Sequence, residues 1–390
     1  MGAVTRALFI NSGILGQRTF AEFVRSAFST ERDGVSVVQV LVTDDLTIAE
    51  RVMRRLLCAR LSPHRGWLAN VDLHRFRCEL NAGLLARRRF TRLARSGHTF
   101  DVLHFHRQAT AYASLDLMRR IPSIVSLDTT QICVVQNAGS RLEARSYAPN
   151  IRRDGEIFRA ARLIVSASEW AARSIREEYP SCATEIAVMP NPVPLPPGSD
   201  GWCDERYRRA TADAGYRPRV LFIGGDFPRK GGYQLLRAWS AARMETRAAL
   251  DIMSNWPLDV DALPPGVTVH RKIFPHTPAW NALWRASDIF VMPTRDEAFG
   301  NVYQEAAAAG LPAIGTRINA IPEVVHDGLT GLLVPRDDEQ ALVEALDALI
   351  ASPERRREMG ARGRPSVAAS ADPEEYRRKL AAAIRRIAGH

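Results

Sequence analysis

The stretch "ASDIFVMPTRDEAFGNVYQEAAAAGLPAIGT", residues 286–316, decides the predicted fold of this 390-residue chain. Residues 289–294 are an apolar run typical of a buried strand, and 301–310 are an alanine-rich helical stretch that a Gly-Leu-Pro sequence ends. A second apolar run, 312–316, follows at once. Strand, loop, helix and strand in this order form the crossover unit of a parallel sheet. The stretch therefore predicts an α/β protein.

The same alternation runs along both halves of the chain. Strand candidates that are apolar throughout are separated by helical stretches, which predicts parallel sheets covered on both faces. They lie at 7–11, 35–41, 101–106, 122–128, 163–168 and 186–190, and then at 219–225, 248–254, 267–274, 289–294, 312–316 and 331–335. Residues 189–201, "MPNPVPLPPGSDG", have the composition of a linker. We therefore predict two Rossmann-like parallel-sheet domains that face each other across a cleft.

The bulk composition excludes several protein classes. A hydrophobic share of 46% and a charged share of 25% are ordinary for a globular protein. No apolar run approaches the roughly 20 residues that a bilayer-spanning helix requires, and the first residues indicate a buried strand and not a signal peptide. The five scattered cysteines include no CxxC pair, so they predict neither a disulfide framework nor a zinc site. We expect a cytoplasmic protein.

Positive charge is concentrated in one segment. The net charge is +10, and residues 51–95 contain twelve arginines against two acids. Such a segment suits peripheral contact with an anionic membrane at its inner face, or an anionic glycan. The run of Arg87, Arg88 and Arg89 is its densest part. The alternative is an ordinary solvated helix face, and we expect no nucleic-acid partner.

Residues 224–232, "GGDFPRKGG", form the first candidate site. Gly224 and Gly225 end a predicted strand, and Arg229 and Lys230 precede an apolar-periodic helix. Glycines allow a close approach of the backbone to a ligand, and adjacent guanidinium and ammonium groups can neutralise a diphosphate. The spacing is not that of a Walker loop.

Glu297 and Glu305 form the second candidate site. A helix that starts near Gly300 or Asn301 has free first amides and a positive dipole end, which suit a phosphate. Carboxylates would repel that phosphate, so we expect them to accept hydrogen bonds from the vicinal hydroxyls of a ribose and a sugar. Diphosphate and diols together describe a nucleotide sugar. The alternatives are helix caps or the acid and base of a glycoside hydrolase.

These residues resemble a known family. Glu297 to Glu305 with "AFGNVYQ" between them resembles the E-x7-E motif of the retaining family 4 glycosyltransferases, which have the GT-B fold. Residues 305–346 are similar to the end of that family's donor domain, 224–232 to its phosphate-binding loop, and 161–193 to its approach to the linker. The resemblance implies an acceptor domain over 1–195, a donor domain over 196–372, and a C-terminal helix over 373–390 that returns to the first domain.

The resemblance also implies roles in the donor domain. Glu305 would bind the nucleotide ribose and Glu297 the transferred sugar, and both would be helped by the backbone amides of Phe299, Gly300, Asn301 and Val302. Arg229 and Lys230 would stabilise the leaving diphosphate in the place that a metal ion takes elsewhere. We therefore expect no metal and no cofactor, with a UDP- or GDP-sugar as the donor substrate.

In the acceptor domain, the resemblance places Gly13 and Gly16 near the phosphates and the acceptor. Asp128, in "VSLDTTQ" (125–131), stands where many relatives carry a histidine. An aspartate cannot donate a hydrogen bond unless it is protonated, so Asp128 either accepts one from the acceptor hydroxyl or is a helix cap or turn residue. His104 and His106 are predicted to be structural.

The expected function is retaining transfer of a hexose-type sugar to a glycan, lipid-linked or small-molecule acceptor by a front-face mechanism. Three alternatives stay open: a catalytically silent protein that binds nucleotide sugars, a glycoside hydrolase, and a dinucleotide-dependent dehydrogenase. The last lacks the GxGxxG sequence that such enzymes carry.

Overall fold

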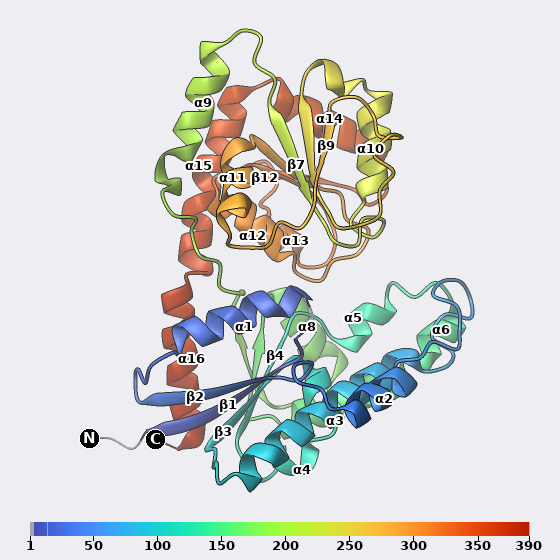
Figure 1. Cartoon of the computed structure of the whole chain (residues 1–390), viewed down its shortest axis with the longest axis vertical. Coiled ribbons are helices and arrows are strands. Elements are labelled where there is room, and N and C mark those ends of the chain that lie inside the picture. Colours follow the sequence, from blue (N-terminus) through green and yellow to red (C-terminus); the bar gives the residue numbers. More distant parts are fainter. Residues whose placement is uncertain (1–3, 14, 390) are drawn as a thin grey trace. The chain divides into compact units, whose positions relative to one another are not determined.

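The computed structural model describes residues 4–13 and 15–389, and for residues 15–17 it describes the backbone element alone. The chain folds into two compact units (Figure 1). The first comprises Met1–Pro192 together with Pro373–His390, and the second comprises Val193–Asp372. Each unit has its own parallel sheet and its own buried core.

The sheet of the first unit has the strand order β2-β1-β3-β4-β5-β6, with every neighbouring pair parallel. Its strands are β1 (Thr5–Asn11), β2 (Val35–Leu41), β3 (Val102–His106), β4 (Ser123–Leu127), β5 (Leu163–Ser166) and β6 (Glu185–Val188). Its helices are α1 (Leu15–Ala27), α2 (Ile48–Leu57), α3 (His74–Arg95), α4 (Leu115–Met118), α5 (Gln131–Val135), α6 (Arg141–Ser146), α7 (Ala148–Ala160), α8 (Glu169–Glu178) and α16 (Pro373–Ala388), with a 3-10 turn η1 (Gln108–Ala111).

Alternate residues of the central strand β1 belong to two different core clusters. Phe9 packs in a cluster with side chains of α1 and α16, whereas Leu8 packs in a cluster with side chains of α3, α7 and α8. Side chains of successive strand residues point to opposite faces, so both faces of this sheet are covered. The C-terminal helix α16 contributes Tyr376, Leu380 and Ile384 to the cluster of Phe9.

The sheet of the second unit has the order β12-β11-β10-β7-β8-β9 and is also parallel. Its strands are β7 (Arg219–Ile223), β8 (Ala249–Met253), β9 (Val267–His270), β10 (Ile289–Met292), β11 (Ala313–Thr316) and β12 (Gly331–Val334). Its helices are α9 (Trp202–Ala212), α10 (Gly232–Ala241), α11 (Pro278–Ala286), α12 (Asn301–Ala308), α13 (Ile321–Val324), α14 (Glu339–Ile350) and α15 (Pro353–Ser370), with 3-10 turns η2 (Ser199–Gly201) and η3 (Met244–Thr246).

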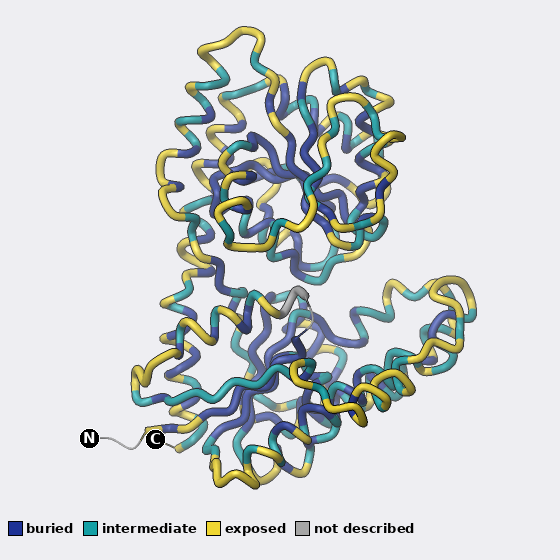
Figure 2. The backbone as a smooth tube through the Cα atoms, viewed as in Figure 1, coloured by how far each residue is buried: buried dark blue, intermediate teal, exposed yellow. Residues whose placement is uncertain are grey.

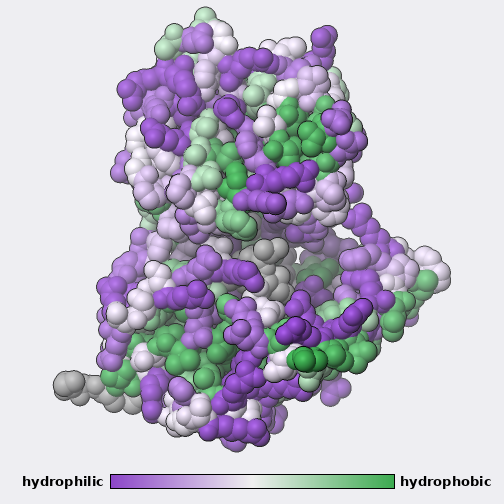
Figure 3. Space-filling view, viewed as in Figure 1, coloured by the Kyte–Doolittle hydropathy of each residue, from purple (hydrophilic) through white to green (hydrophobic). Residues whose placement is uncertain are grey.

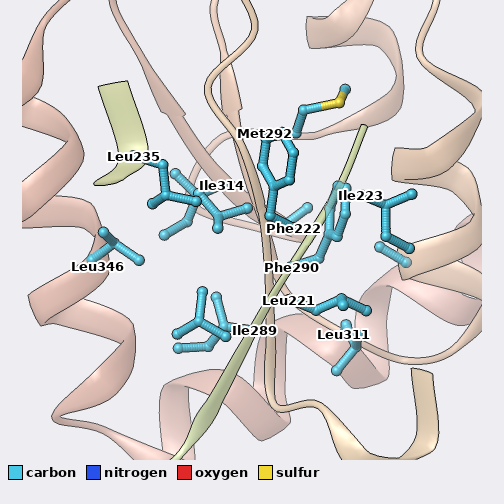
Figure 4. Close-up of a cluster of buried hydrophobic side chains, with 14 of the residues drawn as sticks. Leu221, Phe222, Ile223, Leu235, Ile289, Phe290, Met292, Leu311, Ile314 and Leu346 are labelled. Carbon is cyan, nitrogen blue, oxygen red and sulfur yellow. The ribbon is translucent and has the colours of Figure 1, made fainter. Parts of the chain in front are cut away.

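The core of the second unit is built on its central strands. Phe222 of β7 and Phe290 of β10 belong to this core, and Figure 4 shows Leu235 of α10 and Leu346 of α14 together on one side of the central strands. Both phenylalanines are fully buried. In Figure 2 the central strands of each sheet are mostly dark blue, the edge strand β2 is mostly teal, and most exposed positions lie on the helices and loops around the sheets.

The predicted α/β class and the predicted strands are confirmed, although most strands end one to four residues earlier than predicted. The apolar run 267–274 is a strand only as far as His270, because Lys272 has a φ of 58° that is incompatible with an extended chain. The predicted helix start is at Asn301. Among the described helices, none is long and apolar enough to cross a membrane.

Candidate functional site

The predicted phosphate loop lies against the loop that carries Glu297. Residues 224–231 leave β7 and lead into α10, and residues 293–300 leave β10 and lead into α12. Gly231 has a φ of +77°, and a Cβ atom there would lie 1.9 Å from the carbonyl oxygen of Pro293. The left-handed conformation and the close approach of the two backbones both require glycine at position 231.

Hydrogen bonds join these two loops. The Arg295 amide donates to the Arg229 carbonyl oxygen at 2.9 Å, and the Thr294 hydroxyl donates to the same oxygen at 3.2 Å. In the other direction, the Arg229 guanidinium donates to the Asp296 carbonyl oxygen at 2.5 Å. The two segments, more than sixty residues apart in sequence, therefore form one structural element, which we call the paired loops (residues 224–231 and 293–300).

The charged groups of the paired loops balance each other. The Lys230 ammonium forms an ion pair with the Glu297 carboxylate, and their side chains are only 15% and 17% exposed. The Arg229 guanidinium lies 3.1 Å from an oxygen of Asp226 and is more exposed. Burial, and then the Arg229 guanidinium, lower the pKa of Lys230. The carboxylates of Asp296 and Asp226 oppose this lowering.

Helix α12 begins beside these charges. Its N-cap residue is Gly300, with a φ of +81° and no side chain that caps the helix. A Cβ atom on Gly300 would lie 2.6 Å from the ring of Tyr303. Phe299 is buried, so only its backbone can face a ligand. Asn301 and Val302 are the first two helical residues. Gly300 thus leaves the helix end open, and the positive end of the dipole lies next to the paired loops.

Glu305 has different surroundings from Glu297. It lines a cavity of about 250 Å³ together with Trp280, Asn281 and Trp284 of α11, His276 just before that helix, and Pro194–Pro197 of the linker. Its Oε2 atom is buried and has no hydrogen-bond partner within the described protein. Burial raises the pKa of Glu305 to about 8. The structure therefore gives Glu297 a cation as its neighbour and Glu305 a largely apolar cavity.

In the first unit, the predicted residues lie at the carboxyl ends of the strands. Gly13 follows β1 with a φ of +75°, and a Cβ atom there would lie 2.0 Å from the Thr43 hydroxyl oxygen. Gly16 falls within α1, at a place where side-chain surroundings lie outside the described structure. Asp128 follows β4 and lies 3.4 Å from the guanidinium of Arg107, which follows β3. The N-cap residue of α5 is Thr130, so the helix-cap interpretation of Asp128 is wrong.

The two histidines of β3 are structural, as predicted. His104 is fully buried and shares a hydrogen bond of 2.6 Å with the Ser126 hydroxyl. The ring of His106 stacks on Phe20 at a centroid distance of 4.0 Å. Burial lowers the pKa of both rings, so both are neutral at physiological pH.

Sequence reasoning missed several residues that shape the site. Asp226 pairs with Arg229, and its place three residues before Arg229 was the available signal. Asn319 donates a hydrogen bond of 2.8 Å to the Glu297 carbonyl oxygen. Arg107 holds Asp128. No sequence spacing could have indicated the last two contacts, because they depend on which strands are neighbours.

Metal-ligating side chains are not gathered in the part of the chain that the structure describes. No group of three or more His, Cys, Asp or Glu residues there is arranged to hold an ion. Asp259 and Asp261 lie in an exposed loop, and the Asp261 amide donates a hydrogen bond to the Asp259 carboxylate.

Two family models match the chain, one on each unit. The model described as "Glycosyl transferases group 1" matches residues 217–352. The model described as "Glycosyltransferase Family 4" matches residues 33–195. Together they cover the strands of the second unit and most of the first unit, and both describe glycosyltransferases.

Relatives with assigned functions are also glycosyltransferases. The chain is 34% identical over 215 residues to the GDP-mannose-dependent alpha-(1-6)-phosphatidylinositol monomannoside mannosyltransferase of Mycolicibacterium smegmatis, an alignment that spans 50% of this chain and 56% of that protein. It is 28% identical over 326 residues to the D-inositol 3-phosphate glycosyltransferase of Corynebacterium glutamicum, spanning 78% of this chain and 76% of that protein. The chain thus spans little more than half the length of the first relative.

Among solved structures, the sucrose-phosphate synthase of Thermosynechococcus elongatus has a similar fold. The TM-score is 0.73 at 19% sequence identity, and the match covers 98% of this chain and 99% of that one. The predicted two-domain GT-B architecture is thereby confirmed.

Proposed function

The chain belongs to the family 4 glycosyltransferases of the GT-B fold, and from this premise we propose that it transfers a hexose-type sugar from a nucleoside diphosphate sugar to an acceptor hydroxyl. The observation that carries the proposal is the Lys230–Glu297 ion pair in the paired loops, next to the open start of α12. Cations, a carboxylate and the positive end of a helix dipole are the groups that the two halves of a sugar diphosphate require.

The ion pair suggests how the donor is taken up. Lys230 and Glu297 form their ion pair where both side chains are poorly exposed. A donor would bring a phosphate oxygen to Lys230 and sugar hydroxyls to Glu297. Each buried charge would then exchange one partner for another. Neither would be left unpaired, and an unpaired buried charge is costly in free energy. Phosphate and sugar must arrive together, so this arrangement favours the intact donor.

Glu305 and its cavity are proposed as the nucleoside site. An ionised carboxylate can accept hydrogen bonds from the 2′- and 3′-hydroxyls of a ribose, and the buried Oε2 atom has no protein partner. A cavity of about 250 Å³ with Trp280 and Trp284 in its wall offers apolar surface to a nucleoside. The name of the first relative favours GDP as the nucleotide, and UDP is the alternative.

For the transfer step, we propose that Arg229, Lys230 and the first amides of α12 stabilise the leaving diphosphate. The acceptor hydroxyl would attack from the face on which the diphosphate leaves, so the configuration at the sugar would be retained. Charge stabilisation by these two side chains would make a metal ion unnecessary. Glu297 would hold the sugar without forming a covalent bond to it.

The acceptor is proposed to be a polyol, free or linked to a lipid or glycan. The names of the two relatives contain inositol 3-phosphate and a phosphatidylinositol monomannoside. In the first unit, Asp128 and Arg107 lie at adjacent strand ends. A carboxylate that accepts from a hydroxyl, beside a guanidinium that attracts an anionic group, suits such an acceptor.

The first test is donor binding and hydrolysis by the purified protein. We expect one class of UDP- or GDP-sugar to raise the melting temperature, and its slow consumption to persist in EDTA. Lys230→Ala and Glu297→Ala should abolish consumption, whereas the exposed Arg237→Ala on the neighbouring helix α10, which removes an ion pair with Glu339, should not. Consumption unchanged in both site variants would refute the assignment.

The product distinguishes the remaining functions. Retention is read from the anomeric proton coupling of the product, and inversion would refute the front-face route. Nucleotide-sugar binding without any transfer would indicate a silent binding protein. Release of free sugar from a simple glycoside, without nucleotide, would indicate a hydrolase.

A further inference from the structure

The most exposed large apolar side chains of the described chain are concentrated in one segment. Leu61, Ile48, Leu56 and Trp67 are 80%, 78%, 69% and 67% exposed, more than any other large hydrophobic residue described, and Val52 between them is 52% exposed. All five lie within residues 47–67, which contain α2 and the loop that follows it. Scattered exposed hydrophobics are normal on a protein surface, but such a cluster marks an interaction site.

Helix α2 has two apolar faces, and the protein covers only one of them. Ile48, Val52 and Leu56 are spaced four residues apart and lie on one face. Met53, on the other side of the helix, packs against the core of the first unit. In Figure 3 hydrophobic atoms form a green stripe where α2 lies in Figure 1, with hydrophilic atoms beside it, and Figure 2 shows this helix largely in yellow.

The exposed charged side chains of this segment are all basic. Its charged side chains other than Glu50 are five arginines, at 51, 54, 55, 60 and 65. Glu50 is buried, and its carboxylate is used in the capping box that starts α2. Within the described structure, none of the five arginines forms an ion pair with an acid. Three of them surround a hollow of about 540 Å³ together with Leu46, Cys58 and Ala59.

A second helix extends the same surface. The Ser140 hydroxyl donates a hydrogen bond of 3.0 Å to the Trp67 carbonyl oxygen. This bond places the start of α6 next to Trp67, and α6 adds the exposed residues Arg141, Leu142 and Arg145.

The arginine run that the sequence singled out contributes little to this surface. Arg87 forms an ion pair with Asp116. Arg89 is 7% exposed, donates to the Asp44 carbonyl oxygen and lies 3.9 Å from Glu50. These two side chains fasten α3 to its neighbours. The five arginines of residues 47–67 lie on α2 and its loop, outside the run at 87–89, in which only Arg88 is exposed.

We propose that residues 47–67, with the start of α6, form a docking surface for a bilayer that contains anionic lipids. An apolar stripe flanked by arginines is what an interfacial helix requires, since the stripe enters the acyl boundary and the guanidinium groups contact the headgroups. A second copy of the chain fits less well, because a two-fold interface would bring the same unpaired arginines face to face. The inference concerns binding alone and stands whether or not the proposed transfer is correct.

The test uses the full chain and vesicles of phosphatidylcholine with 30% phosphatidylglycerol. We expect co-sedimentation that falls as salt rises, and quenching of Trp67 by brominated lipid that disappears in Trp67→Phe. The triple variant Ile48→Gln/Val52→Gln/Leu56→Gln and the triple variant Arg51→Gln/Arg54→Gln/Arg55→Gln should each bind at least ~10-fold more weakly, since one basic residue near such a membrane contributes about 1 kcal/mol. Glutamine keeps the helix propensity, and unchanged circular dichroism confirms folding.

Matched control variants test whether binding depends on this surface or on the total charge and exposed apolar area of the chain. Val260→Gln/Leu329→Gln removes exposed apolar groups of the second unit, and Arg119→Gln/Arg173→Gln/Arg355→Gln removes three exposed arginines elsewhere. Both should bind as the unchanged chain does. Equal binding to pure phosphatidylcholine, wild-type binding by both α2 variants, or a dimer that the Ile48/Val52/Leu56 variant dissociates would each overturn the proposal.

Discussion

Glu305→Gln should change how the stability of the protein depends on pH. The carboxyl is held in a largely apolar cavity, and burial raises its pKa from 4.5 to about 8. Between these two values the unfolded chain has released the proton while the folded chain retains it. Stability therefore falls as pH rises through this window. At about 1.4 kcal/mol for each pH unit, the full effect is on the order of 5 kcal/mol. Glutamine has a similar shape and no proton to release.

The assay is urea unfolding followed by tryptophan fluorescence at pH 5, 6, 7, 8 and 9. Trp280 and Trp284 line the cavity of Glu305, so the signal reports on the unit that contains it. The difference in unfolding free energy between Glu305→Gln and the unchanged chain should grow in favour of the variant up to about pH 8 and then level off. Equal pH profiles for the two proteins would refute the reasoning.

Nucleotide binding gives a second measure of the same group. If ribose hydroxyls donate to the ionised carboxylate, binding lowers the pKa of Glu305 and releases a proton at pH 7. Calorimetry with UDP or GDP in two buffers of different ionisation enthalpy would detect that proton, and Glu305→Gln should abolish its release. Proton release that persists in the variant would exclude Glu305 as its source.

Three further outcomes are expected. Gly231→Ala should lose at least ~2 kcal/mol of stability, because a left-handed alanine costs about 1–2 kcal/mol and its Cβ would collide with the Pro293 carbonyl. Gly225→Ala is the control in the same thermal melt, since no atom lies within 4 Å of a Cβ atom added there. Asn319→Gly preserves the left-handed backbone but deletes the hydrogen bond to the Glu297 carbonyl. The KM for the donor should rise about 5-fold, which corresponds to a loss of ~1 kcal/mol of binding free energy. An unchanged KM would show that this bond does not position Glu297. Burial and Arg107 lower the pKa of His106 to about 3, so below pH 6.5 the unfolded chain gains a proton that the folded chain does not. His106→Gln should therefore reduce the loss of stability at acid pH. Equal pH profiles for the two proteins would show that His106 does not cause that loss.

The sequence was sufficient for the strands and for the start of α12, because both follow from local chemistry. Apolar runs of the right length form buried strands in any α/β protein, and a glycine before an alanine-rich stretch marks a helix end. The contact of Lys230 with Glu297 requires in addition that β7 and β10 be neighbours, which they are. Crossover helices decide that order, and a single sequence does not reveal it.

The arginines of residues 51–95 show the opposite limit. Counting charges identified the segment, but a count cannot distinguish an arginine that forms an ion pair from one that is exposed without an acid partner. Arg89 is buried beside the acid that caps α2, whereas Arg55 on the far side of that helix is exposed. The difference arises from the packing of α2 against α3, which fixes the face that points inward.

The paired loops have a consequence for how donor specificity can change. The Gly231–Pro293 contact and the Arg229–Arg295 and Lys230–Glu297 interactions join segments 224–231 and 293–300 into a single structural unit. A graft that replaces one segment from a relative would meet a mismatched partner in the other. Chimeric transferases with an altered donor preference should therefore exchange both segments together, and in natural relatives substitutions in one should be accompanied by substitutions in the other.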